Sequence, residues 1–448
     1  MYRWLRSPVA DSGMNQLQNR VSKYCIIGYI IVVNYRPRMA DEAMADMLSA
    51  LGGVLVEGPR GCGKTTTALH HARSHIRMDA GPEVRELASL NPRALLAGAP
   101  PRLIDEWQLA PDLWNVARHE IDDRRERGQF ILSGSSTPPS DPSRHSGAGR
   151  IGRIRMRPMS LAESGQSSQE VTLAHLESGE PVTGRGRLTY CEIADAAITG
   201  GWPALLNVAP RQARAFNRSY LDDLCSSAIP SATGVRHDPV RMRRLIESVA
   251  RNLASEATLA TLAADVSGDG AAFDPKTART YLDALTTVFG VDELPAWSVA
   301  LRSKSRLRTS TKLHLADPAL ACAALGVSAD RLAQDPAFFG QVFESMVTRD
   351  MRAMVEARFG AAYHYRDNTG LEIDLILEYE DRRWAAIEVK LGSSRIPEAE
   401  RALLTLRDSR VDLQRLGQPA FLAVVTGTEY AYTLPSGVHV VPLSALGT

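Results

Sequence analysis

The amino-acid sequence predicts an α/β protein: a parallel sheet with helices, then a helical region, then an α/β domain that mixes helices and strands. Three observations carry this prediction. Short apolar segments alternate with helical patterns over residues 54–132, which is typical of a parallel sheet. Helical patterns then dominate residues 192–334. After residue 337, one helix precedes three β-rich segments.

The first elements can be placed in order from their apolar spacing. A helix begins at Asp41, where Met44, Met47 and Leu48 share one face, and the glycine pair at 52–53 ends it. The elements that follow are strand 54–56, a helix from Lys64, strand 103–104, helix 112–127 and strand 130–132. Two segments rich in Ser, Pro and Gly, 133–149 and 165–186, are expected to be long loops.

The composition limits the class of protein. Of the 448 residues, 44% are hydrophobic and 23% are charged, which is ordinary for a globular chain. The net charge is +1, so contact with nucleic acid or acidic membranes must come from a local patch. The longest apolar run, residues 25–33, is too short to span a bilayer, and we expect no membrane contact. The cysteines form no CxxC pair, which predicts reduced thiols and a cytoplasmic location; they are Cys25, Cys62, Cys191, Cys225 and Cys322.

A glycine-rich segment between a predicted strand and helix carries the strongest functional signal. It matches GxxxxGK[ST] at every fixed position over Gly58, Pro59, Arg60, Gly61, Cys62, Gly63, Lys64 and Thr65. Thr66 follows as a further candidate for nucleotide binding. Glycines let backbone N–H groups curl around phosphate oxygens, and the helix presents its positive end to them. Lys64 is expected to neutralise the terminal phosphates of ATP and Thr65 to hold Mg²⁺.

A pair of carboxylates completes the predicted nucleotide site. Asp105 and Glu106 follow the strand at 103–104. Asp105 is expected to hold Mg²⁺, and Glu106 to polarise the attacking water. Ser135, after the next strand, is predicted to contact the γ-phosphate or the water, although ordinary turn chemistry explains the Ser-Gly-Ser-Ser sequence almost as well.

Arginines follow the first long loop in an alternating pattern that predicts a strand with one basic face. The segment runs from Arg150 to Arg157. Arg150 is the candidate arginine finger, a group that stabilises the charge of the transferred phosphoryl group. If Arg150 acts in trans, the functional unit is an oligomer. A solvated or acid-paired strand face explains any single one of these arginines equally well.

These motifs together resemble prokaryotic AAA-type ATPases that carry a C-terminal domain of unknown function. The matching residues are Tyr35-Arg36-Pro37-Arg38, Gly58 to Thr67, Asp105-Glu106-Trp107-Gln108, Ile131 to Ser135, Gly149-Arg150, Gly200-Gly201-Trp202-Pro203 and Leu315-Ala316-Asp317. The resemblance implies a P-loop core, a winged-helix module and a restriction-endonuclease-like domain. The predicted division is an N-terminal extension 1–34, the ATPase domain 35–190, a helical lid or linker 191–235, the winged helix 236–334 and the last domain 335–448.

The middle of the chain also carries a helix-turn-helix pattern. Asp274 caps the second helix, Pro275 fits its first position, and Lys276 and Arg279 lie on its exposed face. A basic stretch follows at the expected wing, with Arg302, Lys304, Arg306, Arg308 and Lys312. Contact with the DNA backbone and contact with protein or ring neighbours explain this pattern equally well.

The last domain contains a second cluster with possible chemistry. The strand at 372–377 carries Asp374, and the strand at 384–390 carries Glu388 and Lys390. With Glu344 from the preceding helix, these residues resemble the D…ExK core of nucleases and form a possible second Mg²⁺ site. A cross-strand salt-bridge cluster is the alternative.

The sequence thus predicts a Mg²⁺-dependent AAA-type ATPase whose hydrolysis cycle rearranges its C-terminal domains or a bound DNA or protein partner. ATP and Mg²⁺ are the expected ligands, and a homo-oligomer such as a ring is the expected assembly. The first alternative is an ATP-gated DNA nuclease that uses the C-terminal cluster. The second is a binding or regulatory module switched by nucleotide.

Overall fold

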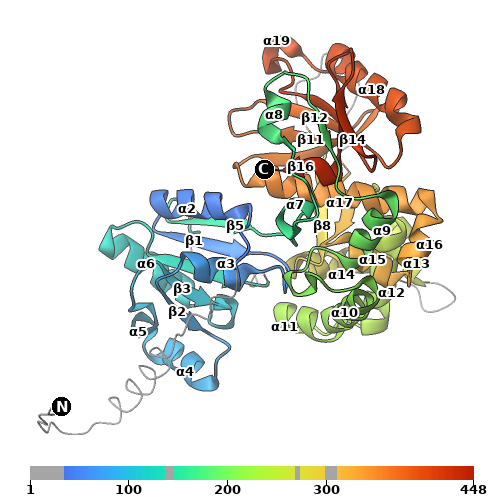
Figure 1. The fold of residues 1–448 in the computed structure, drawn as a ribbon. Helices are drawn as coiled ribbons and strands as arrows, with labels where there is room; N and C mark the ends of the chain where they lie inside the picture. The colour runs from blue at the N-terminus through green and yellow to red at the C-terminus, as the bar shows by residue number, and fades with distance from the viewer. Residues whose placement is uncertain (1–34, 137–145, 268–272, 298–309, 448) are drawn as a thin grey trace, which may run out of the picture.

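The computed structural model describes residues 35–136, 146–267, 273–297 and 310–447 (Figure 1). Residues 1–34 and the basic residues Arg302, Lys304, Arg306 and Arg308 lie outside these ranges. For reference below, the first domain is residues 35–164, the middle region is residues 190–333 and the C-terminal domain is residues 336–447. No helix in the described ranges is both long and apolar enough to cross a membrane.

The first domain is built on a five-stranded parallel sheet in the order β2-β3-β4-β1-β5. Its strands are β1 (Gly53–Glu57), β2 (Ser74–Arg77), β3 (Arg102–Asp105), β4 (Phe130–Gly134) and β5 (Ile151–Arg155). Its helices are α2 (Ala40–Ala50), α3 (Lys64–His71), α4 (Pro82–Leu90), α5 (Pro92–Leu96), α6 (Leu113–Arg124) and α7 (Leu161–Ser164), with the 3-10 turn η1 (Trp107–Leu109). The predicted parallel α/β architecture is confirmed.

Alternation along the strands gives the sheet two apolar faces. Val54 and Val56 pack in the same core as Met44 of α2 and Ala68 of α3. Leu55 points to the opposite face, where helices α4, α5 and α6 supply the partners. Strand β2 was not predicted, because only Ile76 of its four residues is buried and the sequence shows no apolar run there.

The middle region is helical and contains one antiparallel pair of strands, which precedes its last two helices. Its helices are α9 (Tyr190–Thr199), α10 (Pro210–Asp223), α11 (Ile229–Thr233), α12 (Pro239–Arg251), α13 (Leu259–Ser267), α14 (Pro275–Thr287), α15 (Pro318–Ala324) and α16 (Ala329–Ala333). Strands β8 (Val291–Leu294) and β9 (Lys312–Leu315) pair after α14. Asp274 caps α14 through the backbone N–H groups of Lys276 and Thr277, as its position predicted.

The C-terminal domain packs a seven-stranded mixed sheet between helices, in the order β10-β11-β12-β13-β15-β14-β7. The edge strand β7 (Gly184–Arg185) comes from an earlier part of the chain. The long helix α17 (Pro336–Glu356) contacts one face and α18 (Ile396–Thr405) the other. The strands are β10 (Ala361–Arg366), β11 (Glu372–Glu378), β12 (Trp384–Lys390), β13 (Leu422–Thr426), β14 (Tyr430–Thr433) and β15 (His439–Pro442), with the short helix α19 (Leu413–Leu416) and the end strand β16 (Leu446–Gly447).

The segment predicted as the second long loop belongs with the C-terminal sheet. It contains β6 (Val171–Thr172), α8 (Leu173–Glu177) and β7 (Gly184–Arg185). Strand β6 pairs with β16, and β7 pairs with β14 at the sheet edge. These pairings satisfy backbone groups that a free loop would leave to solvent. The last part of the predicted ATPase domain therefore runs along the C-terminal domain instead (Figure 1).

A buried group of charges joins the three parts. Asp292 of β8 contacts Arg157, which follows β5, at 3.1 Å and Arg352 of α17 at 3.2 Å. Burial opposes ionisation of Asp292, but the surrounding arginines hold its pKa well below its usual range. The three parts are thus tied by ion pairs as well as by apolar packing.

Candidate functional site

The glycine-rich segment forms a loop between β1 and α3, as the motif predicted. At two of its glycines, a side chain would clash with neighbouring atoms and strain the backbone. Gly58 has φ +152°, and a Cβ there would lie 2.2 Å from the carbonyl oxygen of Met156. Gly63 has φ +104°, and a Cβ there would lie 2.9 Å from a guanidinium nitrogen of Arg38. The loop can therefore hold its curl only with glycine at these positions.

Lys64 begins α3 and folds back over the loop. Its Nζ donates hydrogen bonds to the carbonyl oxygens of Gly58 at 2.9 Å and Pro59 at 2.8 Å. The side chain is buried, so these carbonyls are the groups that hold its charge. Because an ammonium has no fixed bond direction, Lys64 can exchange these carbonyls for phosphate oxygens at the same loop.

Thr65 and Asp105 meet where α3 approaches the end of β3. The Thr65 hydroxyl donates to Asp105 Oδ1 at 2.9 Å, and the Ser133 hydroxyl donates to the same carboxylate. Asp105 is 1% exposed. A hydroxyl and a carboxylate at a phosphate-binding loop are the hard oxygen donors that Mg²⁺ prefers, so the residues fit this ion.

Glu106 has a strained backbone that turns the chain sharply at the end of β3. Its φ is +54°, a region that non-glycine residues rarely adopt. Its carboxylate accepts hydrogen bonds from Ser135 Oγ at 3.2 Å and from Gln108 Nε2. Ser135 therefore lies beside Glu106, near where the sequence placed it. Gln108 and Ser133 lie within the motifs quoted above, but only the structure gives them partners.

Arg150 lies far from this cluster in its own chain. It precedes β5, and its carbonyl accepts from Gly53 at the start of β1, whereas the P-loop follows the end of β1. Five strand residues separate those ends by roughly 16 Å. Arg150 is exposed and contacts Asp122 at 2.9 Å, which lowers the pKa of that carboxyl. Arg150 therefore lies away from the site of its own chain, and its ion pair with Asp122 fits the acid-paired alternative. A role as a finger in trans stays a prediction.

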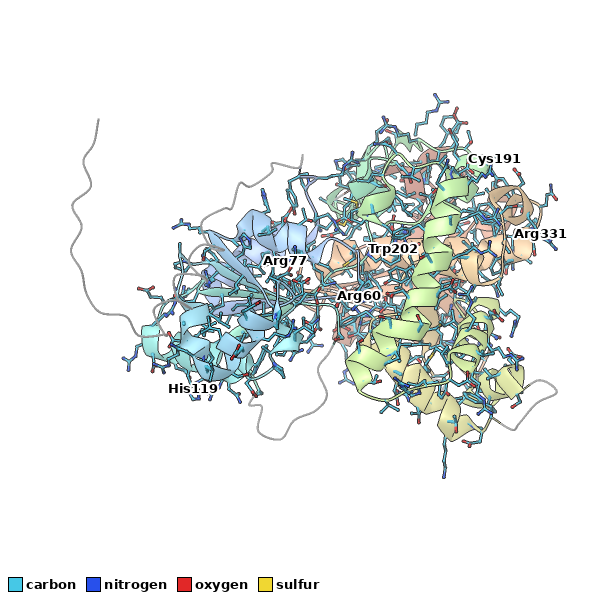
Figure 2. The ribbon with its side chains drawn as sticks, turned by 90° about the horizontal axis from the view of Figure 1, so that it is seen from below. Arg60, Arg77, His119, Cys191, Trp202 and Arg331 are labelled. Carbon is cyan, nitrogen blue, oxygen red and sulfur yellow. The ribbon has the colours of Figure 1, made fainter. Side chains whose placement is uncertain are left out.

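The middle region covers the P-loop through the Gly-Gly-Trp-Pro segment. Trp202 is fully buried, and its ring lies 3.9 Å from where a Cβ of Gly61 would be. Tyr220 of α10 stacks near Trp202 and donates to the carbonyl oxygen of Arg60 at 3.3 Å. Figure 2 shows Arg60 and Trp202 at the junction between the first domain and the middle region. A cavity of about 280 Å³ opens beside them and is lined by Arg60, Gln108, Ser135, Tyr220 and Leu224, among others.

The C-terminal cluster converges as the strand pattern predicted. Lys390 Nζ lies 2.5 Å from Glu388 and 3.4 Å from Asp374, and Glu344 reaches the same place from α17. Burial raises the pKa of Glu344 to about 7 and that of Glu388 to about 8. Burial also opposes ionisation of Asp374, but Lys312 and Lys390 lower its pKa.

Lys312 enters this cluster from the middle region. Its Nζ lies 2.8 Å from Glu344, 2.9 Å from Glu372 and 3.6 Å from Asp374. The side chain is 1% exposed, so Lys312 is not available to DNA, which was one of the two uses considered for the basic stretch. Within the described ranges, no group of three or more His, Cys, Asp or Glu side chains is arranged to hold a metal ion. The residues predicted as a second Mg²⁺ site are paired with lysines instead.

Comparison with known protein families agrees with this architecture. Residues 52–165 match an AAA domain, residues 191–331 a domain of unknown function (DUF8612) and residues 339–446 a second one (DUF4143). The chain carries an AAA-type P-loop domain and a C-terminal DUF4143 domain. This confirms the resemblance inferred from the motifs. The DUF8612 match covers the helical lid and the predicted winged helix together.

Similar proteins are known in mycobacteria and among solved structures. The uncharacterized proteins Rv2008c of Mycobacterium tuberculosis and Mb2031c of Mycobacterium bovis are each 28% identical over 405 residues, covering 88% of this chain and 81% of theirs. A Walker-type ATPase of Pyrococcus abyssi is 13% identical with a TM-score of 0.39, covering 65% of this chain and 96% of its own. The replication initiator DnaA, solved with AMPPCP and single-stranded DNA, is 12% identical with a TM-score of 0.26, covering 59% and 90%. Both structural likenesses are slight.

Proposed function

We propose that the protein is a Mg²⁺-dependent ATPase of the AAA type. The observation that carries this proposal is the meeting of Lys64, Thr65, Asp105 and Glu106 at one end of the parallel sheet. Loop N–H groups and Lys64 bind the phosphates. Thr65 and Asp105 hold Mg²⁺, which when bound neutralises charge on the transferred phosphoryl group.

Glu106 is the proposed base that orients and polarises water. Ser135 and Gln108 both donate to its carboxylate, which fixes the direction of the oxygen that faces water. A glutamine at position 106 keeps the shape but accepts no proton. We therefore expect Glu106→Gln to bind ATP and to lose turnover, measured as phosphate release, whereas equal turnover would refute the role of Glu106.

We propose that ATP binding and hydrolysis rearrange the middle region and the C-terminal domain, or a bound DNA or protein partner. The supporting contacts run from the P-loop to Trp202 and Tyr220. Arg150 is the proposed finger in trans, which makes the working form a homo-oligomer. Light scattering with and without ATP tests this, since a monomer that turns over ATP at the full rate contradicts a finger in trans.

A nuclease function is not supported by the C-terminal cluster. Cleavage needs a divalent ion near Asp374 and Glu388, and the ammonium groups of Lys312 and Lys390 take up those oxygens. The residues do not fit the ion, so we derive no cleavage step. The nucleotide-switched module remains the alternative, and it is favoured if turnover is slow while oligomerisation depends on nucleotide.

A further inference from the structure

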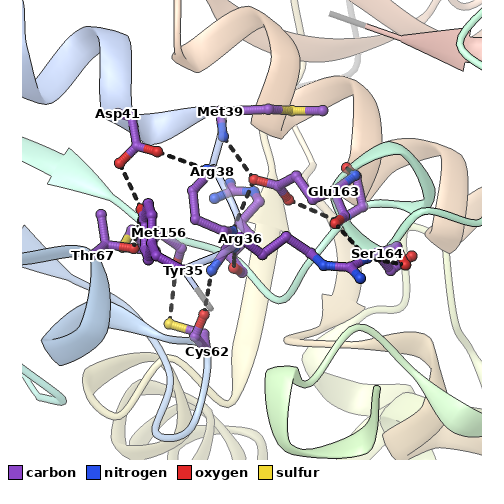
Figure 3. A network of polar contacts seen from close by, with 12 residues as sticks. Tyr35, Arg36, Arg38, Met39, Asp41, Cys62, Thr67, Met156, Glu163 and Ser164 are labelled. Atoms are coloured by element: carbon purple, nitrogen blue, oxygen red, sulfur yellow. Dashed lines mark hydrogen bonds and ion pairs between the residues drawn. The ribbon is translucent and has the colours of Figure 1, made fainter. Parts of the chain in front are cut away.

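A buried arginine next to the P-loop has no role in the proposed chemistry. Arg38 lies two residues before the start of α2 and is 7% exposed. Its guanidinium donates to the Cys62 carbonyl oxygen at 2.6 Å, to the Arg157 carbonyl oxygen at 2.8 Å and to Glu163 Oε1 at 2.9 Å (Figure 3). The fork of an arginine suits three acceptors on different segments, which a lysine ammonium cannot span in the same way.

The Cys62 contact fixes the orientation of one peptide group in the P-loop. A trans peptide is planar, and its C=O and N–H point in opposite directions. Because Arg38 binds the Cys62 carbonyl, the N–H of Gly63 in the same peptide points away from Arg38. Inward N–H groups are what a phosphate-binding loop needs.

Glu163 in turn holds Arg38 in place. It is the third residue of α7 and forms a capping box with Ser160, whose N–H donates to Glu163 Oε2 at 2.9 Å. Its other oxygen accepts from Arg38 and from the N–H of Met39 at 2.8 Å. Helix α7 is anchored from the C-terminal domain, since Asp350 of α17 accepts the N–H of Leu161 at 2.8 Å.

We propose that Arg38, held by Glu163, is a positioning residue of the ATP site that turns the Gly63 N–H toward the phosphates. The inference rests on the proposed function. It also makes the C-terminal domain part of the ATP site's support, through α17 and α7. The side chain acts through the loop backbone and touches no reacting atom.

The test compares Arg38→Ala, Arg38→Lys and Arg36→Ala in the full chain. Arg36 is the matched control, because it is exposed and donates to the Ser164 carbonyl on α7 at 2.6 Å. Calorimetry measures the affinity for ATP in the presence of Mg²⁺. Thermal unfolding measures the midpoint temperature without ATP and how far ATP raises that temperature. We expect both Arg38 variants to bind ATP about tenfold or more weakly and to lose most of the ATP-induced rise. Arg36→Ala should behave as the wild type.

Two outcomes separate this inference from the function on which it rests. A wild type that binds no ATP refutes the proposed function and the inference with it. A wild type that binds ATP, with both Arg38 variants within about twofold of it, overturns the inference alone. Should Arg38→Ala fail to fold, Arg38→Lys keeps the positive charge beside Glu163 and decides the question.

A second inference follows independently from Lys312. Four carboxylates and two lysines meet at the base of the C-terminal sheet, and the lysine that contacts most of them comes from β9 of the middle region. His314, two residues along β9, lies 3.1 Å from the Ser345 hydroxyl on α17. Strand β9 is thus fastened to α17 at two points.

We infer that the ammonium of Lys312 is the cation for which this cluster is built, and that the cluster joins the middle region to the C-terminal domain rather than binding a divalent metal. Glu344, Glu372 and Asp374 each turn an oxygen to Lys312. A divalent ion needs those oxygens free. The residues of the nuclease motif are therefore present, but their carboxylates are paired with a lysine from the middle region and are not free to bind a metal ion.

The test uses Lys312→Met, Asp374→Asn and, as control, Lys276→Met at an exposed lysine of the same region. We expect Mn²⁺ titration of the nucleotide-free wild type to show no binding that Asp374→Asn removes. We expect Lys312→Met to lower the unfolding midpoint by about 5 to 10 °C, because it leaves buried carboxylates without their partner. Lys276→Met should leave the midpoint unchanged.

Either of two results overturns this second inference. One is a wild-type Mn²⁺ site whose affinity falls about tenfold or more in Asp374→Asn. The other is a Lys312→Met protein as stable as the wild type. Gain of an Asp374-dependent Mn²⁺ site in Lys312→Met supports it, since the vacated oxygens then accept the ion. If Lys312→Met does not fold, the Mn²⁺ titration of the wild type and Asp374→Asn decides.

Discussion

The P-loop site and the C-terminal acidic cluster contain the same kinds of groups and differ in what their lysines bind. At the P-loop, Lys64 contacts two backbone carbonyls of its own loop, which are neutral, and we propose that phosphate oxygens replace them when ATP binds. In the C-terminal domain, Lys312 and Lys390 contact carboxylates. An ion pair that is already formed leaves little for a ligand to gain. A motif therefore indicates a binding site only when its charged groups are not already matched within the chain.

The largest effect is expected from Lys64→Ala, which removes the exchangeable cation. ATP turnover should fall by a factor of about 10⁴ or more, because both binding and stabilisation of the phosphoryl charge are lost. Phosphate release under saturating ATP measures it, with Lys276→Ala as an exposed control. If Lys64→Ala keeps its ATP turnover, the P-loop lysine is no more available to a ligand than the lysines of the C-terminal cluster, and the comparison fails.

Glu106→Gln should come next in size. Turnover should fall by about a thousandfold while ATP affinity changes little, because only the proton-accepting oxygen is lost. Single-turnover hydrolysis and calorimetry on the same preparation separate the two quantities. Glu388→Gln in the C-terminal cluster is the matched control and should leave turnover unchanged.

Arg150→Ala tests whether Arg150 acts as an arginine finger in the ATP site of a neighbouring chain. We expect turnover to fall by about a hundredfold with ATP affinity preserved. The control is Asp122→Ala, which breaks the ion pair of Arg150 but leaves the guanidinium free. Equal loss in both variants would show that the ion pair itself matters and would contradict a catalytic role.

The smallest expected effect is a pH dependence of stability in the C-terminal cluster. Burial raises the pKa of Glu388 to about 8 from an ordinary 4.5, and its charged neighbours are Asp374, Lys390 and Lys312. The unfolded chain then releases this proton at lower pH than the folded chain, so this contribution to stability declines as pH rises from about 4.5 to 8. Denaturant unfolding across this range should show a shallower decline in Glu388→Gln, and an unchanged slope contradicts the assignment.

The amino-acid sequence predicts a site best where the functional residues lie in one contiguous segment. The P-loop and the acids after β3 follow from local patterns, because parallel strands bring their carboxyl ends to one edge. Contacts between distant segments were not predicted. The sequence around Lys312 does not predict its contacts with Glu344 and Asp374, and the sequence around Arg38 does not predict its contact with Cys62. The packing of residues 171–185 against the C-terminal domain was not predicted either, because strands of two residues are too short to show an alternating apolar pattern.

Calorimetric titration of ATP into the purified wild type and Lys64→Ala, each with Mg²⁺ present, decides whether the P-loop binds nucleotide. We expect one site per chain in the wild type and at least a hundredfold weaker binding, roughly 2.7 kcal/mol, in Lys64→Ala. Equal affinities, or no binding to the wild type, would contradict this expectation.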